Sequence, residues 1–177
     1  MQFGGPAFFI DRSDINTDEI IPAKYLTEIS KQALKPHLLE DLHLEDRIFD
    51  PHSPELRKAS VLVTRSNFGC GSSREHAVWA LEVNDITVVI AESFARIFRQ
   101  NMFNCGILAI ELGSGDIDRI FCLEGDVHVD VDLDSETVTA RELGGEGRSV
   151  TCGFSLNPFD KQLVQAGGWL AYADAKY

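Results

Sequence analysis

One pattern restricts the fold more than any other: a short apolar run, a glycine-rich turn and a helical pattern follow one another. Residues 60–64 are β-branched and apolar, which is typical of a buried strand. Gly69 and Gly71 enclose a cysteine and allow the chain to turn sharply. Ser72 and Glu75 have the spacing of a capping box, which predicts a helix that begins at Ser72. Strand, turn and helix in this order indicate an α/β fold.

The predicted start of this helix has the properties of an anion site. The first backbone N–H groups of a helix have no partner within it, and the helix dipole adds partial positive charge there. Arg74 lies in the same turn, and Ser72 and Ser73 place two hydroxyls beside it. We therefore expect this turn to bind a carboxylate or a similar anion.

Further strand and helix patterns extend this unit into a sheet. Residues 86–91 and 107–110 are continuous apolar runs of the kind buried on both faces, and residues 7–11 are a plausible first strand. Between the two runs, a helical pattern has Ser93 in a capping position and ends at Gly106. Successive strand–helix–strand units predict right-handed crossovers and parallel strands.

The remaining segments are assigned from shorter signals. One of residues 16–18 is expected to cap a short helical turn. A helix is predicted over 29–42, interrupted or started by Pro36, and 46–58 is predicted to be a loop. A short helix is predicted at 117–123, an antiparallel hairpin at 127–132 with 137–140, and a further strand at 149–152. A last helix is predicted between Pro158 and Gly167.

Bulk properties exclude several classes of protein. The 177 residues fit one domain spanning 1–177. The net charge of −12 argues against nucleic acid or an anionic membrane as the main partner. We expect no signal peptide, because the first residues lack a basic region and an apolar core, and no run approaches the roughly 18 apolar residues of a membrane span.

The four cysteines are widely spaced, with no Cys-x-x-Cys pair among Cys70, Cys105, Cys122 and Cys152. This spacing predicts a reduced, cytoplasmic chain without a zinc or iron–sulfur site of its own.

Four segments together resemble the swivelling domain of the aconitase superfamily, in the form of 3-isopropylmalate dehydratase small subunits. They are residues 14–22, 67–77, 91–101 and 106–110, in the same order as in that family. The Gly-Ser-Ser-Arg-Glu block starting at Gly71 is the most specific of them. The resemblance implies a β/β/α three-layer swivelling domain with a mainly parallel central sheet plus an antiparallel hairpin.

The resemblance also implies an activity. In this family a small subunit joins a large subunit that carries a [4Fe–4S] cluster, whose open iron is a Lewis acid. The pair is a hydro-lyase that interconverts 2-isopropylmalate and 3-isopropylmalate by dehydration and rehydration, in leucine biosynthesis. The chain alone would be inactive and would bind no cluster. The implied partners are the large subunit, a hydroxy-dicarboxylate substrate and, for the chain on its own, a further copy of itself.

By the same resemblance, Ser72 is the base that removes the proton, acting as an alkoxide. Ser73 and Arg74 would bind substrate carboxylates, and Asp18 matches a family aspartate beside the substrate hydroxyl. A free serine is too weakly acidic for this role, so the site must stabilise the anion, and the helix N-terminus and Arg74 are the means that the sequence offers. The alternative for Ser72 and Ser73 is helix capping alone.

Substrate choice is assigned to the stretch Tyr25, Leu26 and Thr27. Relatives that act on a tricarboxylate have an arginine where Thr27 stands, so an added carboxylate would lack a partner here. Glu28 would repel such a group, whereas Lys24 would attract it. This favours an apolar substituent such as isopropyl.

Three other interpretations remain open. A homoaconitase-like small subunit, or one for a methyl-substituted malate such as citramalate or dimethylmalate, would share the motifs. An acyl-transfer hydrolase would use Cys70 as nucleophile and a histidine such as His76 as base, although a packed cysteine and a structural histidine are the simpler roles. A non-catalytic anion-binding module would need no cluster-bearing partner.

Overall fold

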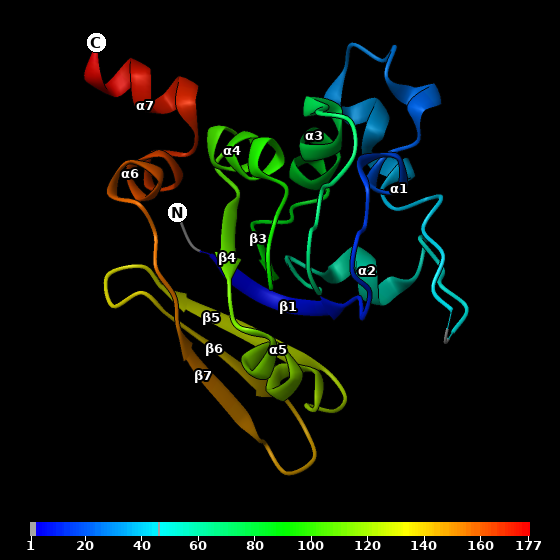
Figure 1. The fold of residues 1–177 in the computed structure, drawn as a ribbon, viewed down its shortest axis with the longest axis vertical. Helices are drawn as coiled ribbons and strands as arrows, with labels where there is room; N and C mark the ends of the chain where they lie inside the picture. Colours follow the sequence, from blue (N-terminus) through cyan, green and yellow to red (C-terminus); the bar gives the residue numbers. More distant parts are fainter. Residues whose placement is uncertain (1–2, 46) are drawn as a thin grey trace.

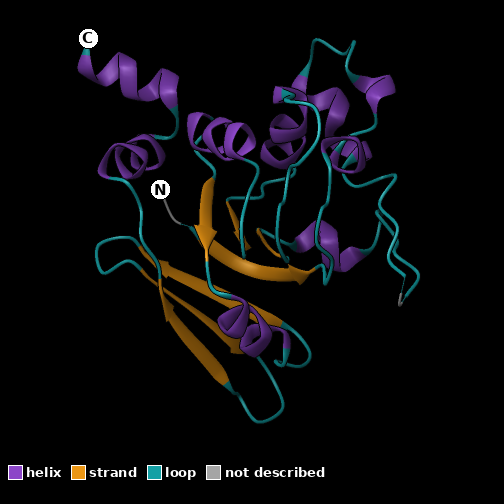
Figure 2. Cartoon of the chain, in the orientation of Figure 1, coloured by secondary structure: helices purple, strands orange, loops and turns teal. Residues whose placement is uncertain are grey.

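The computed structural model describes residues 3–45 and 47–177 and has a mixed seven-stranded sheet surrounded by helices (Figures 1 and 2). The strand order is β4-β3-β2-β1-β5-β6-β7. The strands are β1 (Gly4–Phe9), β2 (Val61–Val63), β3 (Val88–Ala91), β4 (Leu108–Glu111), β5 (Val127–Asp132), β6 (Thr137–Glu142) and β7 (Ser149–Gly153). The α-helices are α1 (Thr17–Ile20), α2 (Pro54–Lys58), α3 (Glu75–Val83), α4 (Arg96–Asn104), α5 (Ser114–Phe121), α6 (Pro158–Ala166) and α7 (Trp169–Lys176). The 3₁₀ helices are η1 (Ala23–Tyr25) and η2 (Lys31–His37).

Strands β1 to β4 are parallel, as predicted, and form the centre of the core. Every residue of β2 and β3 is buried, and the helices α3 and α4 follow these strands in the sequence. Figure 1 shows α3, α4 and α6 together on the same side of the molecule. This arrangement confirms the predicted α/β architecture, with continuous apolar strands buried on both faces.

Strand β1 joins the parallel half to an antiparallel half. Its later residues pair with β2, whereas Gly4, Gly5 and Pro6 pair with β5. A Cβ atom at Gly4 would overlap the backbone carbonyl of Val129, so only glycine allows this close approach. The hairpin of β5 and β6 forms as predicted, β7 extends it, and α5 lies against these strands (Figure 2).

Three of the predictions made from short signals are wrong. Residues 29–42 form no α-helix: η2 is a 3₁₀ helix with Pro36 inside it, since proline lacks an N–H and clashes with the preceding turn. The predicted loop 46–58 contains α2, where Ser53 is the N-cap and Pro54 the first helical residue. Helix α6 ends at Gly167 as predicted, but α7 follows directly.

Ser93 is not a helix cap. Helix α4 begins at Arg96, and the Ser93 hydroxyl accepts a hydrogen bond of 2.8 Å from the backbone N–H of Asn67 instead. The end of α4 is as predicted, because Gly106 has a φ of +78° just after the C-cap residue. In the described part of the chain, no helix is long and apolar enough to cross a membrane.

The antiparallel half contains a buried carboxylate, which predicts a pH effect on stability. Glu142 is 6% exposed and accepts hydrogen bonds from the backbone N–H groups of Glu124 (2.7 Å) and Arg148 (3.0 Å). The Arg148 side chain also donates to it, and together these contacts lower the pKa of Glu142 from 4.5 to about 2. Because the folded protein favours the ionised form, its contribution is complete above about pH 4.5 and is lost as the pH falls towards 2.

We therefore expect Glu142→Gln to lower the free energy of unfolding at pH 7 and to flatten its decline between pH 4.5 and pH 2. Urea unfolding of the isolated chain, followed by circular dichroism at several pH values, measures both effects. Glu146→Gln removes an exposed carboxylate of the same turn and serves as the control. An unchanged slope in Glu142→Gln would contradict this assignment.

Candidate functional site

Two polar loops meet at the carboxyl ends of the neighbouring parallel strands β1 and β2. The backbone N–H of Thr17 donates to the carbonyl of Cys70 (2.9 Å), and that of Gly69 donates to Ile15 (2.8 Å). Asn16 and Cys70 form an isolated parallel bridge. Asn16 and Cys70 are 54 positions apart in the sequence, so two distant segments form one surface. This surface lies at the edge of the sheet where open α/β folds bind their ligands.

Asn16 is the residue that caps the short helix α1. Its side chain accepts from the backbone N–H of Glu19 (2.9 Å), and the Glu19 carboxylate accepts from the N–H of Asn16 (3.3 Å), which completes a capping box. Arg12 donates to the same carboxylate through Nη1 and Nη2 of its guanidinium. The first turn is therefore rigidly placed, and Asp18 projects from it with 60% of its side chain exposed.

The glycines at 69 and 71 have different tasks in the second loop. Both have positive φ values, +83° and +92°. A Cβ atom on Gly69 would overlap the ring of Phe98 in α4, so this glycine allows close packing. Gly71 has space around it, and only its backbone conformation requires glycine.

The predicted capping box at Ser72 is wrong. Helix α3 begins at Glu75, and its N-cap residue Arg74 has an extended conformation (φ −140°) without a side-chain cap. Ser72 and Ser73 precede the helix and are exposed. Within residues 3–45 and 47–177, neither hydroxyl makes a hydrogen bond, so both are available to a ligand.

Arg74 and Asp18, which come from the two different loops, form an ion pair through Nη1 and Oδ1. The Arg74 side chain is 19% exposed. No partner for its Nε or Nη2 is found among the described residues, so one edge of the guanidinium can still donate hydrogen bonds to a carboxylate. The structure thus brings together Ser72, Ser73, Arg74 and Asp18.

The predicted specificity residues lie on the neighbouring loop rather than in this cluster. Tyr25 stacks on His37 with 3.7 Å between ring centroids, and a hydrogen bond with Glu40 raises the pKa of its hydroxyl. Leu26 is half-buried and Thr27 is exposed. In the described part of the chain, no hydrogen bond or ion pair joins these three side chains to the cluster.

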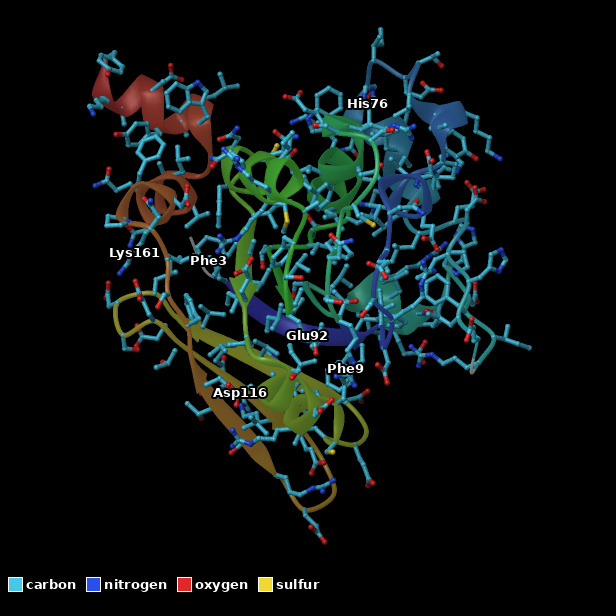
Figure 3. All side chains as sticks on the ribbon, in the orientation of Figure 1. Phe3, Phe9, His76, Glu92, Asp116 and Lys161 are labelled. Atoms are coloured by element: carbon cyan, nitrogen blue, oxygen red, sulfur yellow. The ribbon has the colours of Figure 1, made fainter. Side chains whose placement is uncertain are left out.

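His76 connects this loop to the start of α3. Its Nε2 lies 3.2 Å from the carbonyl oxygen of Glu28, and its ring packs against Trp79 at 4.6 Å. Figure 3 shows His76 at the outer end of α3, far from Asp116 on α5. The structural role predicted for His76 agrees with these contacts, and they place the 25–28 loop next to the Ser72–Arg74 turn.

Cys70 lacks the surroundings of a nucleophile. Burial raises the pKa of its thiol, and the charge of Asp14 raises it further. The ring of His76 is directed to Glu28 and Trp79 rather than to the thiol. A thiol that resists ionisation without a paired base disfavours the hydrolase interpretation.

The described residues of the chain offer no ligand set for an iron–sulfur cluster. Among the described residues, no three histidine, cysteine or acidic side chains are arranged to hold a metal ion. The cysteines are all free thiols, one of them exposed, one buried and two half-buried. A cluster of the kind that the resemblance implies does not fit the side chains of this chain.

Sequence reasoning missed one polar contact at this edge. The buried hydroxyl of Thr17 donates to the carbonyl oxygen of Ser72 at 2.8 Å. The local pattern predicts for Thr17 only a possible role as a helix cap, and it carries no signal for a partner 55 residues away.

Comparisons with known proteins agree with this geometry. The family model of the aconitase C-terminal domain matches residues 5–115. The 3-isopropylmalate dehydratase small subunit of Pseudoalteromonas translucida (strain TAC 125) is 40% identical over 149 residues, covering 80% of this chain and 75% of that protein. A crystal structure of 3-isopropylmalate dehydratase (leuD) from Methanocaldococcus jannaschii superposes with a TM-score of 0.76 and 29% identity, covering 99% of this chain and 95% of that one.

Proposed function

The chain belongs to the family of the aconitase C-terminal domain, and we propose that it is the small subunit of a 3-isopropylmalate dehydratase, a hydro-lyase. The main observation that supports this proposal is that Ser72, Arg74 and Asp18 lie together at one exposed edge of the sheet. A small subunit has a large-subunit partner, and an exposed half-site is what such a partner would cover.

The difficult step in this reaction is removal of a proton from a carbon next to a carboxylate. The resulting dianion is high in energy, so the site must both take the proton and hold the carboxylate. We assign proton removal to Ser72 acting as an alkoxide, which takes the proton and becomes the neutral hydroxyl; no other described residue makes a hydrogen bond with this side chain. The N-terminus of the nine-residue helix α3 and the charge of Arg74 lie next to it and favour a negative charge there.

Arg74 is assigned to a substrate carboxylate. Its Nη1 is fixed by Asp18, so the guanidinium plane is held in place while Nε and Nη2 face the substrate. Ser73 adds a hydroxyl donor for the same group. Asp18 has a second task in this proposal, since its exposed carboxylate lies where a substrate hydroxyl would meet the partner subunit.

The partner is proposed to carry a [4Fe–4S] cluster, which would supply a Lewis acid for loss of the substrate hydroxyl. Because the residues of this chain do not fit the cluster, their tasks are limited to binding the carboxylate, orienting the substrate and moving the proton. The exposed loop of Tyr25, Leu26 and Thr27 would face the remaining substituent. With a neutral threonine at 27, an isopropyl group fits this position better than a third carboxylate.

Reconstitution tests the proposal. We expect the purified chain to be inactive alone and to gain dehydratase activity with a cluster-bearing large subunit, with isopropylmalate preferred over citramalate and homocitrate. Activity should be measured for each substrate, with iron and sulfide assayed in the complex. Activity of the iron-free chain would refute the proposal, and preference for homocitrate or citramalate would replace it by the corresponding relative.

A further inference from the structure

Thr17 holds the turn on which the proposed base lies, and we propose that it is a positioning residue for Ser72. This inference rests on the proposed function, because it concerns the orientation of the group that moves the proton. Thr17 itself is 1% exposed and does not reach the substrate side of the edge.

Thr17 donates two hydrogen bonds to the turn of residues 70–73, one on either side of Gly71. The backbone N–H of Thr17 donates to the carbonyl of Cys70 at 2.9 Å, and its Oγ1 donates to the carbonyl of Ser72 at 2.8 Å. The side chain can make this second bond because Asn16, not Thr17, caps helix α1.

Little else fixes the turn. In the described part of the chain, the bond from Thr17 Oγ1 is the only hydrogen bond to residues 71–73. Gly71 is conformationally permissive, so its own backbone does not select one orientation of the residue that follows. Arg74 and Asp18 anchor the chain only beyond Ser73. The direction of the Ser72 side chain therefore depends on the hydroxyl of Thr17.

A proton-transfer group must lie within hydrogen-bond reach of the proton that it removes, and a misplacement of about 1 Å can lower the rate by about 100-fold. Thr17→Val keeps the shape of the side chain and removes only the donor. We expect this variant, in the reconstituted complex, to lose about 10- to 100-fold in kcat with a smaller change in KM. Thr17→Ser keeps the hydroxyl and should remain within about threefold of the parent value of kcat, since its donor is retained.

Thr64 provides a matched control. It is also 1% exposed, and its Oγ1 donates to the carbonyl of Arg12 at 2.9 Å and to no residue of the 71–73 turn. Thr64→Val therefore loses the same type of buried hydrogen bond, and its kcat should be unchanged. In ¹H–¹⁵N spectra of the isolated chain, the amides of residues 71–73 should shift or broaden in Thr17→Val and not in Thr64→Val.

Equal kcat values for Thr17→Val and Thr64→Val would overturn the proposal, as would an equal loss in Thr17→Ser. If Thr17→Val does not fold, Thr17→Ala replaces it, and loss of the fold in both would show a purely structural hydroxyl and also overturn it. If the proposed function is wrong, the parent complex itself would be inactive, which distinguishes this outcome from failure of the positioning role. The spectra of the isolated chain would still show whether Thr17 orders residues 71–73.

Discussion

Replacing Ser72 by alanine is expected to lower kcat of the reconstituted complex by about 10³-fold, the middle of the range for loss of a positioned proton-transfer group. The KM should change little, because Ser72 is assigned to the proton and not to the carboxylate. Stability should also be unaffected, since Ser72 is exposed and its hydroxyl makes no hydrogen bond within the described residues. Steady-state kinetics and thermal unfolding of the same preparations measure both properties.

Cys70→Ala separates this assignment from the hydrolase interpretation. Burial raises the pKa of the Cys70 thiol, so it is a poor nucleophile at neutral pH. We expect Cys70→Ala to retain activity and alkylation of the parent chain to be slow. If Cys70→Ala were inactive and Ser72→Ala active, the roles assigned to the two residues would be reversed.

The parallel half of the fold could be predicted from local sequence because its signals are strong. Strands β2, β3 and β4 are continuous apolar runs, and the structure buries nearly every residue in them. The turn at Gly106 was also predictable, since a helix that ends in the left-handed region favours glycine.

The start of α3 could not be predicted from local sequence. Ser72 and Glu75 have the spacing of a capping box, but the carbonyl of Ser72 accepts a hydrogen bond from Thr17, and Arg74, the residue before the helix, is extended. This competing contact joins residues 55 positions apart, so no window around Ser72 contains it. The helix begins three residues later than predicted, and the hydroxyls of Ser72 and Ser73 make no hydrogen bond with the described residues.

Helix α7 was missed for a different reason. It has no buried residue, so its sequence lacks the apolar periodicity that identifies a helix packed on a core. Gly167 and Gly168 also predict the end of a helix, and both have positive φ values. A new helix nevertheless begins immediately after them.

The composition of the candidate site was predictable only through the family resemblance. Local patterns identified the Gly71–Arg74 turn as an anion site, but nothing local joined it to Asp18. The structure supplies the link through the Arg74–Asp18 ion pair and the Asn16–Cys70 bridge. The ion pair is a contact that the resemblance did not give: Asp18 accepts a hydrogen bond from Nη1 of Arg74.

Arg74→Lys is expected to lower kcat/KM by about 10- to 100-fold, although the positive charge is retained. Lysine offers a single charged group, whereas the guanidinium of Arg74 can bind Asp18 with one nitrogen and a carboxylate with the other two. One hydrogen bond to a charged group contributes about 1.5–3 kcal/mol, which corresponds to about one to two factors of ten in binding. Most of the loss should therefore appear in KM, and initial-rate measurements over a wide substrate range give the two constants separately.

The fold should be insensitive to this change, because Asp18 is 60% exposed and an ion pair of this kind contributes less than about 1 kcal/mol to stability. Arg119→Lys is the matched control: Arg119 pairs with Asp116 on α5 at 3.1 Å, away from the site, and its replacement should leave both kinetic constants unchanged. Parent-like kinetics in Arg74→Lys would show that a point charge is sufficient and that the fork of Arg74 does not bind the substrate. A loss shared equally by both variants would instead indicate a general effect on assembly with the large subunit.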